Sequence, residues 1–354
     1  MAGINFEGLT PKNGAVQALA ELIFLELANE DKLPQLVTYM TKQENGKKLG
    51  FVGKAGLLGK AAKGCDPTYE NNLVTTTEKT WDIKEWEIAE AICYKELEGT
   101  VAEYLAANGS DAADLTSSEY MDKIVRPMLE QAIAEIYIRF AFFGDKNAEG
   151  TLKEGVDAEN FNLIDGFWKQ LFQGVAAGKT VRVPVAANDG ASIAAQYEAM
   201  KAPGAATGVL NDLIINSPMK LRKMADRVFY VTQAFADMLA LDIQSNNKGS
   251  DLQWESLFAG IKRTTYQGIE LIAVPQFDEI IQDYLKNRTN AAAYDKPFRV
   301  IYGSKGNFRV GTKSSETVAD LKVTFDDVTR KNYLYAADTI GAVVLAEDYA
   351  AVAY

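Results

Sequence analysis

The chain contains no histidine, the side chain that most often acts as a general acid or base near neutral pH. A Ser-His-Asp triad and every histidine-ligated metal centre are therefore excluded. The two cysteines, Cys65 and Cys93, are too far apart in sequence for a Cys-x-x-Cys redox or zinc motif. Asp, Glu, Lys and Tyr could still catalyse a reaction, but no arrangement of them indicates one. We therefore predict no catalytic residue, no metal site and no cofactor.

The sequence also lacks a long apolar run and a signal-like N-terminus. No uninterrupted apolar segment approaches the ~20 residues that a membrane-spanning helix needs. Residues 1–7 do not show the basic-then-apolar order of a secretory signal. An apolar fraction of 47% and a charged fraction of 24% are ordinary for a soluble globular protein. We predict synthesis in the cytoplasm, no membrane partner, and a chain long enough for two or three domains.

Positive charge is scarce, because 37 basic residues face 48 acidic ones and give a formal net charge of -11. Proteins that bind nucleic acid in general carry a basic surplus, so the charge balance argues against that class.

Two segments imitate ligand-binding loops but lack residues that such loops require. Near Lys60 a phosphate-binding loop is suggested, but no glycine stands five residues before Gly59, and Ala61 replaces the magnesium-binding Ser or Thr. The segment that starts at Asp145 begins like a calcium loop. Its twelfth position is Val156, where calcium needs a bidentate Glu. We predict a site at neither segment.

Charges are segregated in the first third of the chain. Six lysines and one acid lie within residues 42–64, whereas eight acids and one base lie within residues 85–114. The acidic segment is either a solvated helix face or a surface that receives the lysine-rich segment of a neighbouring molecule. For the second interpretation, the candidate contact residues are Lys47, Lys48, Lys54, Lys60, Lys63, Glu85, Glu87 and Glu90.

The same region predicts an extended hairpin. Residues 73–77 and 81–88 are rich in β-branched and aromatic residues and favour strands. The turn-like segment 65–72 would join them to the lysine-rich segment. A free-standing hairpin is marginal in water, so we expect this one to lie on another surface.

Two helices are expected on either side of this region. Residues 10–29 begin with an N-cap threonine followed by proline, and they predict a helix that packs on the protein's own core or against a neighbour. Residues 116–119 form a capping box, which opens a long helix that ends at Gly144.

The second half of the chain shows a distinctive succession of elements. A strand-to-helix unit covers 229–241, and residues 265–275 predict a strand interrupted by one glycine and closed by proline. Three strand-like runs follow, and a final apolar segment ends the chain; they cover 298–302, 307–310, 321–325 and 333–354.

This order and spacing resembles the closing half of the major capsid proteins of tailed double-stranded-DNA bacteriophages, the HK-ninety-seven-like capsid fold. The resemblance is clearest over 205–354 and weaker over 117–145. It implies an α+β fold with an N-terminal arm, an extended β-hairpin loop, a peripheral domain with a long spine helix, and an axial domain. The segments that it implies are 1–41 for the N-terminal arm, 42–90 for the extended loop and flanking strands, 91–178 for the peripheral domain with its spine helix, 179–310 for the axial domain, and 311–354 for strands returning to the peripheral domain.

The resemblance implies a structural protein rather than an enzyme. Such a protein self-assembles as hexamers and pentamers into an icosahedral shell that encloses double-stranded DNA. Its partners would be further copies of itself, a portal, and packaged DNA held without sequence-specific contacts. It would be made and assembled in the cytoplasm of the bacterial host and reside in the virion capsid. An acidic wall suits this role, because a wall that bound phosphate tightly would hinder packing and release of the genome.

Two departures from the family pattern refine these expectations. The fold-like pattern begins close to Met1, so we expect the scaffolding protein to be a separate chain. Ala336 and Val343 stand where cross-linking members carry Asn and Glu, so we expect a non-covalent shell. Two alternatives stay open: an encapsulin-type nanocompartment shell protein, which shares the fold and encloses cargo enzymes, and a soluble enzyme that uses paired carboxylates.

Overall fold

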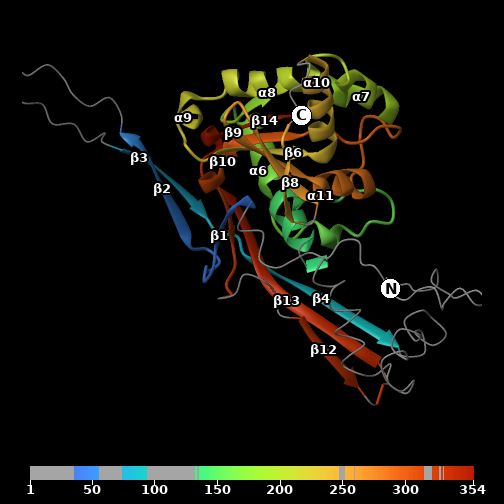
Figure 1. Cartoon of the computed structure of the whole chain (residues 1–354). Helices are drawn as coiled ribbons and strands as arrows, with labels where there is room; N and C mark the ends of the chain where they lie inside the picture. Colours follow the sequence, from blue (N-terminus) through green and yellow to red (C-terminus); the bar gives the residue numbers. More distant parts are fainter. Residues whose placement is uncertain are drawn as a thin grey trace, which may run out of the picture.

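The computed structural model of the chain describes residues 36–55, 74–93, 132–133, 135–246, 252–258, 260–314, 321–326, 328–329 and 331–354. The helix expected over 10–29, the turn at 65–72 and the capping box at 116–119 lie outside the described residues. A body of sheet and helices forms most of the described part, and two β-structures project from it in different directions (Figure 1).

A seven-stranded mixed sheet forms the centre of the body. Its strands are β5 (Val181–Val183), β6 (Arg227–Thr232), β7 (Glu255–Phe258), β8 (Ile261–Tyr266), β9 (Ile269–Val274), β10 (Val300–Ser304) and β14 (Ala350–Ala353). From edge to edge their order is β5-β14-β10-β6-β9-β8-β7. The last strand of the chain therefore lies inside the sheet, parallel to β5 and antiparallel to β10.

Both faces of this sheet are buried, because successive side chains of a strand point to opposite faces. In β6, Val228 and Tyr230 belong to one apolar core, whereas Phe229 and Val231 belong to the other. A nearly continuous apolar strand is what a sheet covered on both sides requires. The helices whose side chains cover the sheet are α6 (Phe167–Ala176), α7 (Ile193–Met200), α8 (Ala205–Asn216), α9 (Met219–Arg222), α10 (Gln233–Asn246) and α11 (Pro275–Glu279).

Short helical turns connect these elements. Two are π-helical and the others are 3-10 turns: η4 (Arg139–Phe143), η5 (Ala158–Asn160), η6 (Ala186–Asp189), η7 (Ile280–Tyr284), η8 (Lys305–Asn307) and η9 (Glu347–Tyr349).

Residues 265–275 form a hairpin and not the single interrupted strand that the sequence predicted. The φ angles of Gln267 and Gly268 are 49° and 75°. Both residues thus adopt the left-handed conformation that a tight two-residue turn between antiparallel strands requires. Tyr266 and Ile269 pair across this turn. Pro275 does close the segment, as the first residue of α11, where a backbone donor is not needed.

A second sheet connects the body to one of the two projections. Its strands are β1 (Thr38–Met40), β4 (Lys84–Cys93), β11 (Phe308–Gly311), β12 (Leu321–Asp326) and β13 (Lys331–Val344). β13 pairs with β11 through residues 341–344, with β12 through 331–336 and with β4 through 331–340. We call the part made of β4, β12 and residues 331–340 of β13 the extension; it points away from the body (Figure 1).

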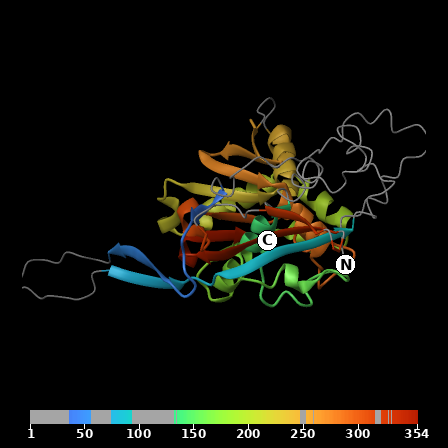
Figure 2. The ribbon, with the colours of Figure 1, turned by 90° about the horizontal axis from the view of Figure 1, so that it is seen from below.

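The other projection is an antiparallel pair of strands, β2 (Lys48–Ala55) and β3 (Val74–Thr80), which we call the ribbon. Within the described ranges, β2 and β3 pair only with each other. The ribbon extends beyond the body in both views (Figure 1 and Figure 2). The predicted hairpin is thus confirmed for these strands, but residues 84–93 leave it and join the extension.

The α+β fold class is confirmed, while two expected segments contribute to both parts of the molecule. Segment 311–354 enters the extension through β12 and β13 but ends in the body sheet as β14. Segment 91–178 contributes η4 and α6 to the core beneath that sheet. The run Ala-Ala-Val-Ala of β14 explains the first difference, because its small apolar side chains suit a strand that is covered on both faces.

A buried carboxylate holds the N-terminus of α10. Asp278 of α11 accepts hydrogen bonds from the backbone N–H groups of Gln233 and Ala234, at 2.5 and 3.0 Å. Burial raises the pKa of Asp278 to about 7, although these two hydrogen bonds oppose the shift. The folded protein therefore binds a proton at Asp278 more tightly than the unfolded chain does.

The free energy of unfolding should contain a contribution from Asp278 that is complete below pH 3.8 and is lost as the pH rises through about 7. The upper bound of this contribution is ~4 kcal/mol, at 1.4 kcal/mol per pH unit. Urea unfolding of the wild type and of Asp278→Asn at a series of pH values measures it as the difference between the two profiles. The control Asp212→Asn, at an exposed position of α8, should follow the wild type. Parallel profiles for Asp278→Asn and the wild type would contradict this assignment.

Candidate interaction surfaces

An apolar cluster anchors the base of the ribbon. Trp81 and Ile83, which follow β3, are almost completely buried and pack with Val343 and Leu345 near the end of β13. Leu49 of the ribbon contacts the same cluster. The base of the ribbon is therefore part of the folded body, and the strands extend away from it (Figure 1).

Two glycines make room for this cluster. Gly311 and Gly341 face each other across the β11–β13 pair. A Cβ atom on Gly311 would lie 2.8 Å from Trp81 Cη2, and one on Gly341 would lie 2.8 Å from Ile83 Cγ1. Carbon atoms normally approach to about 3.5–4.0 Å, so neither position tolerates a side chain without a shift of its neighbour. The close approach of Trp81 to the strands thus depends on both glycines.

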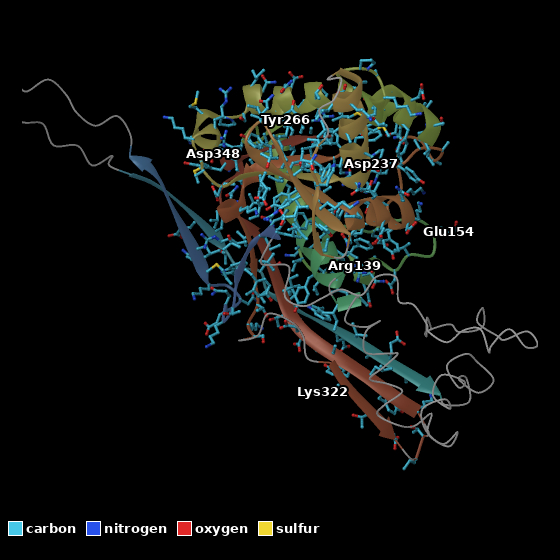
Figure 3. The ribbon with its side chains drawn as sticks, viewed as in Figure 1. Arg139, Glu154, Asp237, Tyr266, Lys322 and Asp348 are labelled. Atoms are coloured by element: carbon cyan, nitrogen blue, oxygen red, sulfur yellow. The ribbon has the colours of Figure 1, made fainter. Side chains whose placement is uncertain are left out.

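An ion pair adds a second contact between ribbon and body. Lys79 of β3 forms a salt bridge with Glu347 of η9, and both side chains are largely buried. Burial opposes ionisation of Glu347, but the hydrogen bond and charge of Lys79, with the charge of Lys179, hold its pKa below the ordinary value. Asp348, the next residue, lies on the side of the body from which the ribbon leaves (Figure 3).

The five candidate lysines are only partly described by the structure. Lys47 and Lys48 are exposed at the start of the ribbon. Lys48 Nζ lies 2.7 Å from Glu78 Oε2, and this hydrogen bond raises the pKa of Lys48. For Lys54 only the place of its backbone in β2 is described, and Lys60 and Lys63 lie outside the described residues.

The extension has two different faces, as the alternation of β13 shows. Leu334 and Ala336 are buried, whereas Tyr333 and Tyr335 are 40% and 44% exposed. Lys322 and Thr324 of β12 are the register partners of Tyr335 and Tyr333. Lys322 lies on the extension, away from the body (Figure 3). We call the side that carries Tyr333 and Tyr335 the tyrosine face.

The three candidate glutamates of β4 divide between these faces. Glu87 pairs with Ala337 and Glu85 with Thr339, so both lie on the tyrosine face. Glu90 pairs with Leu334 and lies on the opposite face. Desolvation, together with the charge and hydrogen bond of Glu87 and the charge of Glu85, raises the pKa of Tyr335.

A structured turn at the end of the extension exposes a large apolar side chain. Val328 is 91% exposed. Asp326 orders the turn, because its carboxylate accepts hydrogen bonds from Val328 N–H at 3.0 Å and from Thr329 Oγ1 at 2.7 Å. These hydrogen bonds hold the backbone of Val328 in place while its side chain remains exposed.

A buried polar network marks the joint between extension and body. Asp338 of β13 accepts hydrogen bonds from Tyr137 Oη and from Thr312 Oγ1, the latter at 2.9 Å. Thr312 Oγ1 also lies 2.9 Å from Thr339 Oγ1. Burial, above all, raises the pKa of Tyr137, so the phenol keeps its proton and continues to donate to Asp338.

Tyr333, Tyr335, Val328 and the Lys79–Glu347 pair were not among the residues predicted from the sequence. The strict alternation of tyrosine with small or apolar residues over 333–336 could have predicted the tyrosine face. Nothing local to either residue could have predicted the ion pair, since its partners are 268 positions apart.

The described part of the chain offers no arrangement suited to a metal ion. It contains no group of three or more acidic or cysteine side chains placed to hold one. Among its helices, none is long and apolar enough to cross a bilayer.

No protein-family model and no curated protein matches the sequence. Several solved structures are similar in fold. The capsid of an empty GTA particle is 13% identical and has a TM-score of 0.48, with 96% of this chain and 96% of that chain covered. A structure from Mycobacterium phage Ogopogo is 11% identical with a TM-score of 0.47, covering 97% and 98%. The satellite phage P4 procapsid including size determination (Sid) protein is 13% identical with a TM-score of 0.45, covering 92% and 94%.

These likenesses concern the fold alone. Because the identities and TM-scores are low, the likeness assigns no function to this chain.

Gly341→Ala should destabilise the base of the ribbon, because its Cβ would meet Ile83 Cγ1 at 2.8 Å and the Asp82 carbonyl oxygen at 2.9 Å. We expect the free energy of unfolding to fall by about 1–3 kcal/mol, the usual cost of overpacking. Urea unfolding followed by intrinsic fluorescence measures the change. Gly50→Ala is the matched control, since a Cβ atom there has no neighbour within 4 Å. Equal stability of the two variants would show that Gly341 is not needed for the packing of Trp81 and Ile83.

Proposed function

We propose that the chain is the major capsid protein of a tailed double-stranded-DNA bacteriophage. Copies of it assemble as hexamers and pentamers into an icosahedral shell around the genome. The observation that carries this proposal is the ribbon, whose two strands have no third strand beside them in the described part of the chain.

A two-stranded ribbon is marginally stable in water by itself. Among the described side chains of the ribbon, Leu49 and Lys79 at its base attach it to the body. Both strands nevertheless extend away from the base: β2 leads outward as far as Ala55, and β3 returns from Val74. A second copy that covers the ribbon would supply the missing contacts, and in a closed shell every ribbon would have such a neighbour.

The tyrosine face and the turn at Val328 support the same conclusion. Two half-exposed tyrosines and one exposed valine lie on an ordered sheet and turn, away from the body. Aromatic side chains of this kind are frequent at the centres of protein interfaces, since they bury a large area and keep a polar group for hydrogen bonding. The extension therefore offers a second surface for neighbouring copies.

Charge complementarity would set the register between copies. The lysine-rich segment with Lys47, Lys48, Lys54, Lys60 and Lys63 is proposed to contact the acidic strand with Glu85, Glu87 and Glu90 of a neighbour. Glu85 and Glu87 share the tyrosine face, and Glu90 would contribute from the edge or the opposite face. Opposed charges of this kind govern orientation and encounter more than raw affinity.

In this proposal the body has the role of the axial domain and the extension that of the peripheral domain. The role is structural and requires no catalytic group. A separate scaffolding protein, a portal and packaged DNA complete the list of partners, with assembly in the host cytoplasm and the virion capsid as the final location.

Assembly of the purified protein tests the proposal directly. The chain, expressed alone and then with its neighbouring genes, should form shells, tubes or capsomer rings that negative-stain electron microscopy resolves. Double-stranded DNA in particles made with the neighbouring genes supports a phage capsid, whereas enclosed cargo enzymes would indicate an encapsulin-type compartment. Dispersed monomers or dimers under both conditions would sink the shell proposal.

We expect denaturing electrophoresis of the particles to show one band, because the shell is non-covalent; a ladder would contradict this.

Reversal of two lysines tests the proposed charge contact. Lys54→Glu combined with Lys60→Glu should lower the yield of closed particles by roughly tenfold or more, because each attraction of about 0.2–1 kcal/mol becomes a repulsion in every copy. Wild-type assembly should also weaken as salt rises, since surface charges are screened. The matched control reverses Lys262 and Lys286, which are exposed on the body. Normal shells from the Lys54/Lys60 variant would refute the contact.

A further inference from the structure

We infer that the salt bridge between Lys79 and Glu347 is a latch that fixes the direction in which the ribbon leaves the body, and that this direction decides whether copies assemble in a regular way. This inference rests on the proposed function. In it, Lys79 and Glu347 are positioning residues, because they orient the ribbon.

The register of the ribbon places the latch on the face that meets the body. Lys79 is the partner of Leu49, so both side chains lie on the same face. Leu49 contacts the apolar cluster at the base, and Lys79 reaches Glu347 on a different element. Lys48 and Glu78 lie on the other face, where they pair with each other and are exposed. One face of the ribbon is therefore held at two separate points.

Glu347 is itself held in place on the body. Its backbone carbonyl accepts a hydrogen bond from Thr180 Oγ1 at 3.0 Å. Its side-chain stem packs so closely on α6 that a Cβ atom on Gly174 would lie 3.2 Å from Glu347 Cβ. The carboxylate thus presents a fixed target, with Lys179 Nζ 3.7 Å away and Lys79 on the ribbon.

A fixed direction matters because the ribbon is long. The eight residues of β2 span about 26 Å at roughly 3.3 Å each. A tilt of about 20° at the base would therefore move the far end by about 9 Å, which is well beyond the reach of a hydrogen bond or salt bridge. A ribbon held only by Leu49 could reach a neighbour in many orientations, whereas a latched ribbon can reach it in few.

The latch should open in acid. The pKa of Glu347 is lowered from its ordinary value of 4.5 in the folded protein, so its contribution is present above pH 4.5 and is lost as the pH falls through the lowered value. The charged groups around the carboxylate are Lys79 from the ribbon and Lys179 from the loop after α6, while neighbouring Asp348 is paired with Lys220.

Pulsed electron paramagnetic resonance on unassembled subunits tests the latch without reference to the shell. Nitroxide labels at Thr76 of the ribbon and Gln173 of α6, in a background without Cys65 and Cys93, report the distance between ribbon and body. We expect a narrow distribution for the wild type and a broad one for Lys79→Glu. The charge-swapped variant Lys79→Glu/Glu347→Lys should restore most of the narrow distribution, although Lys179 will disfavour the new lysine. The milder variant Lys79→Gln serves if Lys79→Glu fails to fold.

The same variants, without labels, then test the consequence for assembly. Lys79→Glu should give aberrant or open particles from subunits that are still folded, and the charge swap should return regular ones. Lys220→Glu is the matched control, because it breaks the ion pair with Asp348 on the same 3-10 turn, and no ion pair joins Lys220 to the described side chains of the ribbon. It should leave both the distance distribution and the particles as in the wild type.

The outcomes separate the latch from the proposed function. A narrow, unshifted distance distribution in both Lys79 variants would overturn the latch, whatever the particles look like. Regular particles formed by a variant with a broad distribution would overturn the link to assembly. A wild type that never assembles would overturn the proposed function, yet the distance measurement would still decide whether the ion pair directs the ribbon.

Discussion

Continuity of β13 is the constraint on which the rest of the described structure depends. Its fourteen residues pass without a break from the extension into the body. Residues 331–340 pair with β4, and 341–344 pair with β11. A hydrogen-bonded strand cannot bend freely, since bending would break its ladder, so the direction of the extension is set by the pairing of β13 with β11. Figure 1 shows β13 running from the body into the extension, so the two parts are joined rigidly.

A side chain completes the backbone hydrogen bonds of β13 where its pairing with β4 stops. Beyond Ile340 the backbone of β13 would lack partners on the side that β4 occupied. The side-chain amide of Gln170 on α6 donates to Ala342 O at 2.8 Å and accepts from Val344 N–H at 2.9 Å. It thus imitates a neighbouring strand for one step of the ladder. An unpaired buried backbone group costs about 1–3 kcal/mol, so a helix can cover the end of the strand only with such a residue.

Elements that depend on local sequence patterns were predictable from the sequence. Features that depend on how distant segments pair were not. The apolar runs of β6 and α10, and the first position of Pro275, follow from periodicity and backbone preference. The left-handed turn at Gln267 was missed because glutamine there is not a usual turn former. Among the surfaces, charge segregation was visible in sequence. The separation of Glu90 from Glu85 and Glu87 was not, because the predicted strand ended at residue 88, whereas β4 continues to Cys93 and places Glu90 one alternation step out of phase with the other two.

In the proposed function, the exposed surfaces also have to keep unassembled copies soluble. Two-stranded ribbons and sheet edges invite indiscriminate pairing, and exposed charges are the usual protection. Lys48 and Glu78 occupy the outer face of the ribbon, and Glu85 and Glu87 flank the tyrosines of the extension. Single contacts between copies would then be weak and sensitive to salt. In the proposed shell, weak contacts that are repeated in every copy would let misplaced subunits dissociate, whereas a correctly closed array would gain from all of its contacts at once.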